Sequence, residues 1–116
     1  MTDSTDIKVG GIYWVDLNDT IGNEQKGRRP AVVIAKHSET FLCMVIPMTS
    51  QDVSRYSYTQ LIRKTNRNGL LQDSYAMIFQ TRTINTKRIR NQIGMIDDID
   101  FMSILKQLYD YLKLNT

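Results

Sequence analysis

The apolar residues of this chain occur in short runs that end at glycine, proline or polar residues, and this spacing constrains its fold more than any other feature. Runs rich in β-branched and aromatic residues cover 11–17, 31–35, 41–48, 56–62 and 74–79, and 81–84 continues the last of them. Each run has the length of a strand, and a series of short strands is typical of a small barrel or sandwich. The pattern therefore predicts a mainly β fold.

The last part of the chain has a helical period instead. Asp97 is a candidate helix cap, with Asp98 and Asp100 in the first turn, where the helix dipole favours acids. The apolar residues that share one face of this helix are Phe101, Ile104, Leu105, Leu108 and Leu112, with Met102 and Tyr109 beside them. We expect the helix to pack on the core of its own domain; a dimer surface is the alternative.

Three segments are less regular. The stretch 18–28 is polar and aperiodic, and ordered loops of this length often carry function. Pro47, near the end of the run 41–48, predicts an edge strand or a bulge, because proline cannot donate to a strand ladder. The segment 88–96 fits either a strand or a short helix.

Length and composition indicate one domain. The chain has 116 residues, 41% of them hydrophobic, and a chain of this size has room for a single core. We expect one domain over 1–116, with 1–8 as a flexible polar N-terminus. The apolar runs are shorter than the roughly 18 residues of a membrane span, and the first residues lack the apolar stretch of a secretory signal. These features predict a cytoplasmic protein that does not bind a membrane.

The chain has one cysteine, Cys43, and one histidine, His37, which limits the disulfides, metal sites and catalytic thiols that it can form. One cysteine excludes a disulfide within the chain, and one cysteine with one histidine does not make a zinc site alone. Because Cys43 lies in the apolar run 41–46, we interpret it as a buried small apolar residue rather than as a thiol paired with His37. The sequence predicts no metal and no cofactor.

Charge is distributed unevenly along the chain. The formal net charge is +3, but positions 55–90 contain eight basic residues and a single acid, Asp73. Such asymmetry favours a positive face that binds a polyanion or an acidic protein. A solvated surface without a ligand is the alternative, and composition does not decide between them.

The most informative stretch is 22–30, GNEQKGRRP. Pro30 favours an extended conformation at Arg29, which fixes how this arginine leaves the loop. Its guanidinium could then hold a phosphate through two parallel hydrogen bonds, beside the acid of Glu24 and the amides of Asn23 and Gln25. The stretch predicts a polar site next to a phosphate binder; an ordinary surface loop is the alternative.

Four motifs resemble one known family. They are GIYWVDL at 11–17, GNEQ at 22–25 with RPAVVI at 29–34, IPMTS at 46–50, and FQTRTI at 79–84. Their order and approximate spacing are similar to those of the MazF/PemK family of toxin endoribonucleases. The E-Q-x-G-x-R-P pattern of the loop is the most specific part of the resemblance.

The resemblance implies a fold and an activity. The fold would be CcdB/PemK-like, an SH3-like twisted antiparallel barrel with a C-terminal α-helix, in the mainly β (α+β) class. The protein would be a homodimer that cuts single-stranded RNA, leaves 2′,3′-cyclic phosphate and 5′-hydroxyl ends, and is blocked by a cognate antitoxin. No metal would be needed, because the attacking group is the 2′-hydroxyl of the substrate itself.

The resemblance also assigns residues. The catalytic arginine of the family matches Arg29, its catalytic threonine matches Thr49, and Glu24 is the candidate general base. Arg29 would stabilise the charge that develops on the phosphate, and Thr49 would hydrogen-bond a non-bridging oxygen or relay a proton. The further residues expected to bind substrate are Asn23, Gln25, Lys26, Arg28, Ser50, Gln80 and Arg82.

If RNA is the substrate, the basic residues between 55 and 90 should form part of a groove that RNA and an acidic antitoxin tail share. Tyr56, Tyr58 or Phe79 would stack on splayed bases in that groove.

Three positions depart from the family pattern. Asn23 replaces a serine, Phe79 replaces an acidic residue that some members keep, and Gly11 stands where many members have an acid. Phe79 implies an altered base preference or weaker cleavage. Two other functions therefore stay open, a non-catalytic poison of DNA gyrase resembling CcdB and a member that only binds RNA or an antitoxin.

Overall fold

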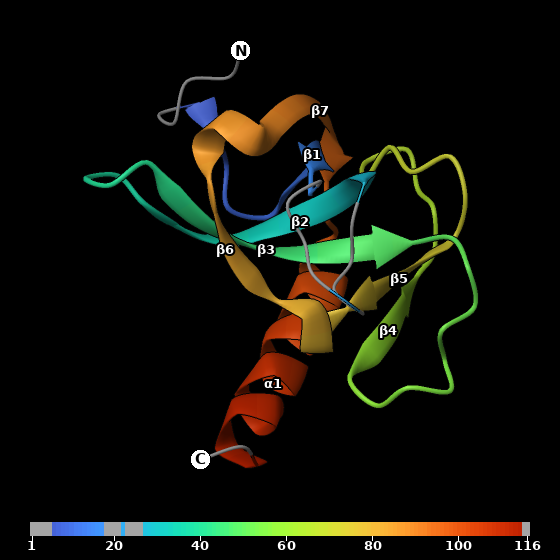
Figure 1. The fold of residues 1–116 in the computed structure, drawn as a ribbon. Helices are drawn as coiled ribbons and strands as arrows, with labels where there is room; N and C mark the ends of the chain where they lie inside the picture. Colours follow the sequence, from blue (N-terminus) through green and yellow to red (C-terminus); the bar gives the residue numbers. More distant parts are fainter. Residues whose placement is uncertain (1–5, 18–21, 23–26, 115–116) are drawn as a thin grey trace.

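The computed structural model describes residues 6–17, 22 and 27–114, which form seven strands, one α-helix and two short 3-10 turns (Figure 1). The strands are β1 (Gly11–Asp16), β2 (Arg28–His37), β3 (Leu42–Thr49), β4 (Thr59–Ile62), β5 (Ser74–Met77), β6 (Arg82–Asn85) and β7 (Ile89–Met95). The 3-10 turns are η2 (Ile78–Gln80) and η3 (Thr86–Arg88), and the helix is α1 (Asp98–Leu114). The predicted mainly β fold with a C-terminal helix is confirmed.

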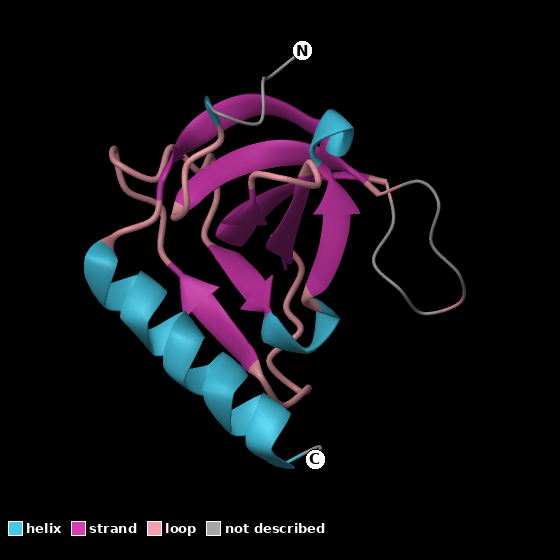
Figure 2. Ribbon diagram, turned by 90° about the vertical axis from the view of Figure 1, so that its left-hand side faces the viewer, coloured by secondary structure: helices cyan, strands magenta, loops and turns pink. Residues whose placement is uncertain are grey.

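The strands belong to one antiparallel sheet with the order β4-β5-β3-β2-β1-β7, and β6 pairs with β3 off this path. The sheet curves strongly, and α1 lies across one of its sides (Figure 2). Within the described chain the end strands β4 and β7 do not pair with each other, so the barrel-like sheet is open along this line.

Strand β3 is the centre of the sheet, which corrects the prediction of an edge strand or a bulge at Pro47. On one side β3 pairs with β2, and Ala31 lies opposite Pro47. On its other side the partner changes from β6, which ends its pairing at Val45, to β5, which begins at Met48. Pro47 therefore occupies the step between two partners, where its missing N–H costs the ladder least.

Two predicted strands are shorter than the apolar runs suggested. The run 74–84 is interrupted by η2, so its two halves become β5 and β6 and pair with different parts of β3. The run 56–62 becomes a strand only at Thr59, because Tyr58 has a φ of 61°, in the left-handed region that a strand residue does not adopt. The undecided segment 88–96 is a strand, β7.

Alternation along the strands divides the core into two clusters on opposite faces of the sheet. Ile12, Val32 and Ile46 are successive cross-strand neighbours in the cluster next to the helix. Tyr13 and Ala31, one position along, belong to the second cluster. Both faces of the central strands are thus buried, which explains why residues around 31–35 form an unbroken apolar run.

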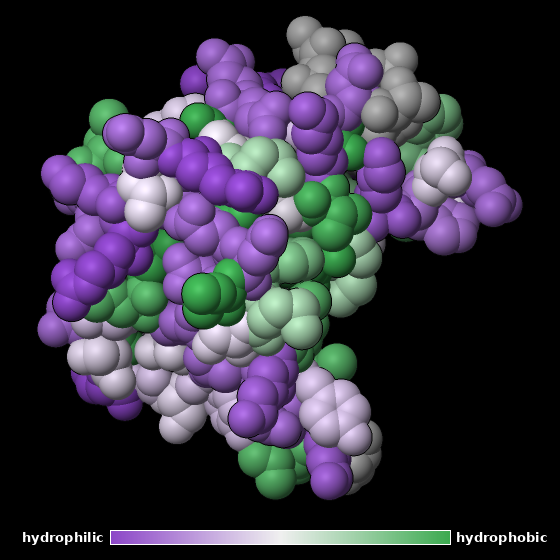
Figure 3. All heavy atoms as spheres, turned by 180° about the vertical axis from the view of Figure 1, so that it is seen from behind, coloured by the Kyte–Doolittle hydropathy of each residue, from purple (hydrophilic) through white to green (hydrophobic). Residues whose placement is uncertain are grey.

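Helix α1 packs on the core of its own chain, as predicted. Ile104 and Leu108 are buried in the cluster next to the helix, and complete burial of such a side chain contributes roughly 1.5–3 kcal/mol. Ser103 Oγ and Gln107 Nε2 both donate to Gln60 Oε1 on β4, at 2.6 and 2.8 Å. The outward apolar residues of the helix are exposed, namely Ile99, Met102, Tyr109, Leu112 and Leu114. Seen from behind, the surface is mainly hydrophilic, with apolar side chains exposed in separate places (Figure 3).

The predicted flexible segment 1–8 is only partly described. Ile7 is fully buried in the second cluster, and the N–H of Lys8 donates to the Tyr13 hydroxyl at 2.9 Å. The last residues of the segment are therefore part of the packed domain. Of the helices in the described chain, none is long and apolar enough to cross a membrane.

Candidate active site

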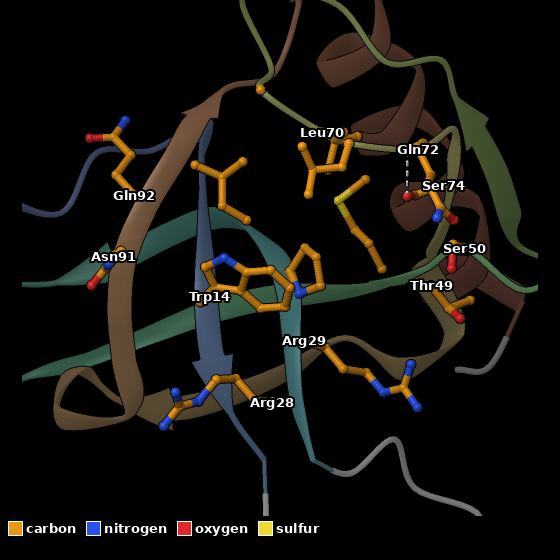
Figure 4. Close-up of a pocket in the computed structure, with 15 residues that line it drawn as sticks. Trp14, Arg28, Arg29, Thr49, Ser50, Leu70, Gln72, Ser74, Asn91 and Gln92 are labelled. Atoms are coloured by element: carbon orange, nitrogen blue, oxygen red, sulfur yellow. Dashed lines mark hydrogen bonds between the residues drawn. The ribbon is translucent and has the colours of Figure 1, made fainter.

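A cavity of about 580 Å³ opens at the end of the sheet where β2 begins and β3 ends (Figure 4). Three parts of the chain that are distant in sequence line it, namely β1 with the start of β2, the end of β3 with the segment 69–74, and β7. The lining residues are Trp14, Arg28, Arg29, Pro30, Met48, Thr49, Ser50, Gly69, Leu70, Leu71, Gln72, Ser74, Asn91, Gln92 and Ile93.

Arg28 and Arg29 are the first residues of β2, which corrects the expectation that Arg29 is an exposed loop residue. The ladder with β1 places Asp16 opposite Arg28 and Val15 opposite Arg29, and Arg29 is half-buried. Because strand side chains alternate, the two arginines leave opposite faces of the strand, and Figure 4 shows them pointing apart. The ladder holds the backbone of Arg29, so the direction of its side chain is fixed better than a loop could fix it.

Thr49 is the last residue of β3 and lies on the neighbouring strand to Arg29. The β2–β3 ladder ends at the pair of Ala31 and Pro47, and Arg29 and Thr49 each lie two residues beyond it on their own strands. Figure 4 shows the Arg29 side chain extending toward the end of β3, where Thr49 and Ser50 lie. The two residues that the resemblance marks as catalytic therefore meet at one site, from segments twenty residues apart.

The hydroxyl of Thr49 is held in place. Thr49 is only 5% exposed, and its Oγ1 accepts a hydrogen bond from the N–H of Gln51 at 3.2 Å. A threonine hydroxyl has one proton of its own to donate, so this arrangement orients the oxygen and leaves its proton for a ligand. Ser50, the next residue, is exposed at the rim of the cavity.

The floor of the cavity is apolar. Trp14 lies opposite Pro30 in the β1–β2 ladder, and Met48, Leu70 and Ile93 complete the surface around it. Trp14 is 37% exposed although it sits in the middle of a strand. From the sequence alone, Trp14 is interpreted only as a strand residue. Its place beside the site follows from the β1–β2 pairing, because Trp14 directly precedes Val15, the cross-strand partner of Arg29.

The far wall, 69–74, is fixed by the buried side chain of Asn68. Its Oδ1 accepts from the N–H groups of Thr65 and Leu70, both at 3.0 Å, and its Nδ2 donates to the carbonyl of Arg63 at 2.8 Å. Gly69 has a φ of 69°, and a Cβ there would lie 2.2 Å from the carbonyl oxygen of Ile93 on β7. Only glycine fits, so the turn at Asn68 and Gly69 also brings the far wall against β7.

The remaining predicted site residues do not line the cavity or are outside the described residues. Asn23, Glu24, Gln25 and Lys26 are among those that the structure does not describe. Gln80 is in η2, and Arg82 begins β6 opposite Val45, earlier on the strand that ends at Thr49. Arg82 Nη1 is buried and has no hydrogen-bond partner among the described residues. The structure thus brings together Arg28, Arg29, Thr49 and Ser50.

None of the basic residues of 55–90 lines this cavity, so the predicted groove is not part of the candidate site. Several of them pair with acids on different parts of the surface. Arg63 contacts Asp73 at 3.3 Å, Arg67 contacts Asp97 and Asp98 at 4.0 and 3.5 Å, and Arg90 contacts Asp16 at 3.8 Å. The basic residues among those that line the cavity are Arg28 and Arg29. The positive charge that lines the cavity with Thr49 therefore comes from the start of β2.

Cys43 is buried, as predicted, and its environment keeps it protonated. Burial raises the pKa of the thiol from 9.0 to about 11. His37 Nδ1 lies 2.8 Å from Thr40 Oγ1, in the turn that joins β2 to β3. Within the described part of the chain, no three His, Cys, Asp or Glu side chains are grouped so that they could hold a metal ion.

Solved structures define the class to which this fold belongs. A crystal structure of MazF from Deinococcus radiodurans superimposes with a TM-score of 0.78 and covers 92% of this chain and 96% of that one. The sequence identity of 21% means that this likeness shows the fold alone. The curved antiparallel sheet with its C-terminal helix is therefore the fold of MazF toxins.

The sequence comparisons identify the family. The model of the PemK-like, MazF-like toxins of type II toxin–antitoxin systems matches residues 8–112, and the chain belongs to this family. Endoribonuclease MazF9 of Mycobacterium tuberculosis is 34% identical over 114 residues, which cover 91% of this chain and 92% of MazF9. Endoribonuclease EndoA of Bacillus subtilis is 31% identical over 97 residues, which cover 79% of this chain and 82% of EndoA.

Proposed function

We propose that this chain is an endoribonuclease toxin that cuts single-stranded RNA. The observation that carries the proposal is that Arg29 and Thr49, on neighbouring strands, line the same cavity, which has an apolar floor. Its toxin family and its curated relatives EndoA and MazF9, both named endoribonucleases, support the same activity.

RNA supplies the nucleophile for this reaction. The 2′-oxygen bonds to the adjacent phosphorus while the bond from phosphorus to the 5′-oxygen breaks. The products are a 2′,3′-cyclic phosphate and a 5′-hydroxyl. The proton of the 2′-hydroxyl passes to a base, and a proton is delivered to the departing 5′-oxygen. The protein needs no nucleophile of its own, and no metal is required to generate one.

Arg29 and Thr49 serve the phosphate in this mechanism. The guanidinium donates two parallel hydrogen bonds to non-bridging oxygens, whose negative charge increases in the transition state. The Thr49 hydroxyl, which accepts a hydrogen bond from the N–H of Gln51, donates a hydrogen bond to one of the same oxygens. We assign the base to Glu24, a residue outside the described part of the chain.

The apolar floor gives the cavity a second role, which is to bind a base of the RNA. Trp14, half-exposed at the centre of the floor, offers the face of an indole ring to an unstacked base next to the reacting phosphate. The rim carries the amides of Gln72, Asn91 and Gln92, which both donate and accept hydrogen bonds, as the edges of bases require. A single-stranded substrate suits this surface, because its bases are free to turn into the cleft.

The test is incubation of the purified protein with a long RNA in excess EDTA. We expect cleavage to continue, and the new 5′ ends to accept phosphate from a polynucleotide kinase without prior phosphatase treatment. Cleavage that stops in EDTA and returns with magnesium would contradict the mechanism, as would products with a 5′-phosphate. Intact RNA together with inhibition of DNA gyrase would favour the alternative of a gyrase poison. RNA that is bound but never cut would indicate a member that has lost catalysis.

The proposed partners follow from the same assignment. A cognate antitoxin would block the cleft, since the family consists of toxins of type II toxin–antitoxin systems, and the site of action would be cellular RNA in the cytoplasm. A homodimer is proposed from the resemblance and from the exposed apolar residues of α1, such as Met102 and Tyr109. Light scattering at micromolar concentration should give twice the mass of 13.5 kDa, and a single species of 13.5 kDa would contradict the dimer.

A further inference from the structure

Three side chains outside the cavity form a continuous stack, which we call the Arg-Tyr-Phe stack. The guanidinium carbon of Arg55 lies 4.4 Å from the centre of the Tyr56 ring. The rings of Tyr56 and Phe79 are 5.7 Å apart between centroids and are inclined by 52°. A cation over one ring, with a second ring tilted against it, forms a surface on which a planar aromatic ligand can stack.

The loop that carries Arg55 and Tyr56 is tied down by its own hydrogen bonds. Asp52 Oδ1 accepts from the N–H and the hydroxyl of Ser54, at 2.9 and 2.6 Å. Arg55 Nη1 donates to the carbonyl of Asp52 at 3.3 Å, and its Nη2 donates to the Tyr56 hydroxyl at 3.0 Å. The hydrogen bonds from Ser54 also lower the pKa of the Asp52 carboxyl. Contacts within the protein itself therefore position Arg55 and Tyr56.

The stack joins the loop that follows Thr49 and Ser50 to η2, which does not line the cavity. Its loop begins directly after Thr49 and Ser50, and the hydroxyl of Thr49 accepts from the N–H of Gln51 in that loop. Its other member, Phe79, sits in η2, next to Gln80 and just before Arg82. A strand of RNA whose phosphate reached Thr49 would thus have a neighbouring base near the stack.

The other tyrosine of this loop is used differently. Tyr58 packs edge-on against Tyr111 of α1, with 4.9 Å between ring centroids, and its carbonyl accepts from the N–H of Phe79 at 3.3 Å. Tyr58 is thus a structural residue that holds η2 against the helix. Tyr56, by contrast, is 47% exposed. Of the three aromatic residues expected from sequence to stack on bases, the structure leaves Tyr56 and Phe79 for that purpose.

We propose that the Arg-Tyr-Phe stack is a subsite for one nucleobase of single-stranded RNA, adjacent to the scissile phosphate. This inference rests on the proposed function and adds the residues that hold the flanking base. The base would stack on the Phe79 ring, which Tyr56 supports from the side, while Arg55 adds positive charge toward the neighbouring phosphate.

The experiment measures binding of a short 2′-O-methyl oligonucleotide, which the protein cannot cut, by fluorescence anisotropy at low salt. Wild type is compared with Phe79→Leu, with Phe79→Trp, and with the control Phe41→Leu, which removes an exposed aromatic ring from the turn between β2 and β3 (57% exposed). We expect Phe79→Leu to raise Kd by roughly tenfold, since one stacked base contributes on that order. Phe79→Trp should restore binding, and Phe41→Leu should leave it unchanged.

A second arm locates the base. Replacing each nucleotide in turn by an abasic one should weaken wild-type binding most at a single position, and the same replacement should cost Phe79→Leu nothing further. If every abasic replacement weakens Phe79→Leu as much as wild type, the subsite is wrong. Cleavage of a long RNA by wild type tests the proposed function separately. Cleavage with no effect of Phe79→Leu on binding overturns the subsite alone, and the absence of both cleavage and binding overturns both.

Discussion

The two ends of the β2–β3 ladder carry different chemistry on the same pair of strands. One end has Arg29 and Thr49 beside the large cavity, at the right of β3 in Figure 1. The other end is the hairpin that extends to the left, with His37 and Cys43 beside a second cavity of about 460 Å³. By residue type alone, a histidine next to a cysteine is the more familiar catalytic pair.

The environment reverses that ranking. Burial raises the pKa of the Cys43 thiol to about 11, so the thiol stays protonated at neutral pH. His37 Nδ1 lies against Thr40 Oγ1 in the turn. Both groups therefore have structural surroundings in the hairpin, the thiol in the core and the imidazole in the turn. At the other end, the Thr49 hydroxyl accepts a hydrogen bond from a backbone N–H, and Thr49 and Arg29 line the same cavity. Convergence on a shared cavity, more than residue type, therefore marks the site.

The largest expected effect is that of Arg29→Ala. Removing one oriented donor from a developing oxyanion lowers the rate by about 10²–10³-fold, and RNA cleavage should fall by that factor. Arg29→Lys should recover only part of the rate, because an ammonium does not grip two oxygens in parallel. The free energy of unfolding should change by about 1 kcal/mol or less, as measured by urea denaturation.

The control for Arg29→Ala is Arg63→Ala, since Arg63 is an exposed arginine paired with Asp73 and does not line the cavity. Its cleavage rate should equal that of wild type. Equal losses in the two variants would mean that general positive charge, and not the position of Arg29, accounts for the activity.

Thr49→Val should have the next largest effect. The substitution keeps the shape of the side chain and removes the hydroxyl, so a hydrogen bond to a charged phosphate is lost. Such a bond is worth about 1.5–3 kcal/mol, which corresponds to a rate loss of roughly tenfold to a hundredfold. Thr49→Ser keeps the hydroxyl and should remain close to wild type. A wild-type rate for Thr49→Val would remove this residue from the mechanism.

Changes at the hairpin end should leave cleavage intact. His37→Ala removes only the contact with Thr40, and Cys43→Ala should lower the free energy of unfolding by about 1 kcal/mol through lost packing. Cleavage rates measured beside Arg29→Ala should equal that of wild type in both variants. A large loss of cleavage in His37→Ala would move the active site to the other end of the ladder.

The smallest expected effect concerns pH. The unfolded thiol of Cys43 ionises near 9.0 and the folded one near about 11, so between these values the folded state holds more protons. The free energy of unfolding should therefore fall as pH rises through this window, and should be unaffected by Cys43 below it. Urea midpoints at pH 8 and 10.5 should show a loss for wild type that is smaller in Cys43→Ala. The same loss in both proteins would mean that Cys43 is not the titrating group.

The periodic features of the chain were predictable from its sequence, and the partner-dependent ones were not. The apolar alternation around Ile12 and Val32, and the helical stripe with Ile104 and Leu108, depend on local spacing, and the structure confirms them. The position of Pro47 in a central strand depends on where β3 exchanges β6 for β5. No local pattern contains that information, because it is a property of three segments at once.

The candidate site divides in the same way. Arg29 and Thr49 were found because motifs mark them, but their meeting at one cavity follows from the pairing of β2 with β3. The floor and the far wall were missed because Trp14, Leu70 and Ile93 converge only in three dimensions. The basic residues of 55–90 predicted a groove at the site, but a charge count does not show that they lie outside the cavity, or that Arg67 and Arg90 pair with acids outside this stretch.

The most direct test of the account is whether Arg29 and Thr49 act on the same phosphate. Single-turnover cleavage of one defined RNA should be measured for wild type, Arg29→Ala, Thr49→Val and the double variant, in EDTA. Residues that serve one transition state as a unit have non-additive effects, so the double variant should be hardly slower than Arg29→Ala alone. A double variant slowed by the product of the two single effects would show that the residues act independently, and would contradict the site proposed at this end of the sheet.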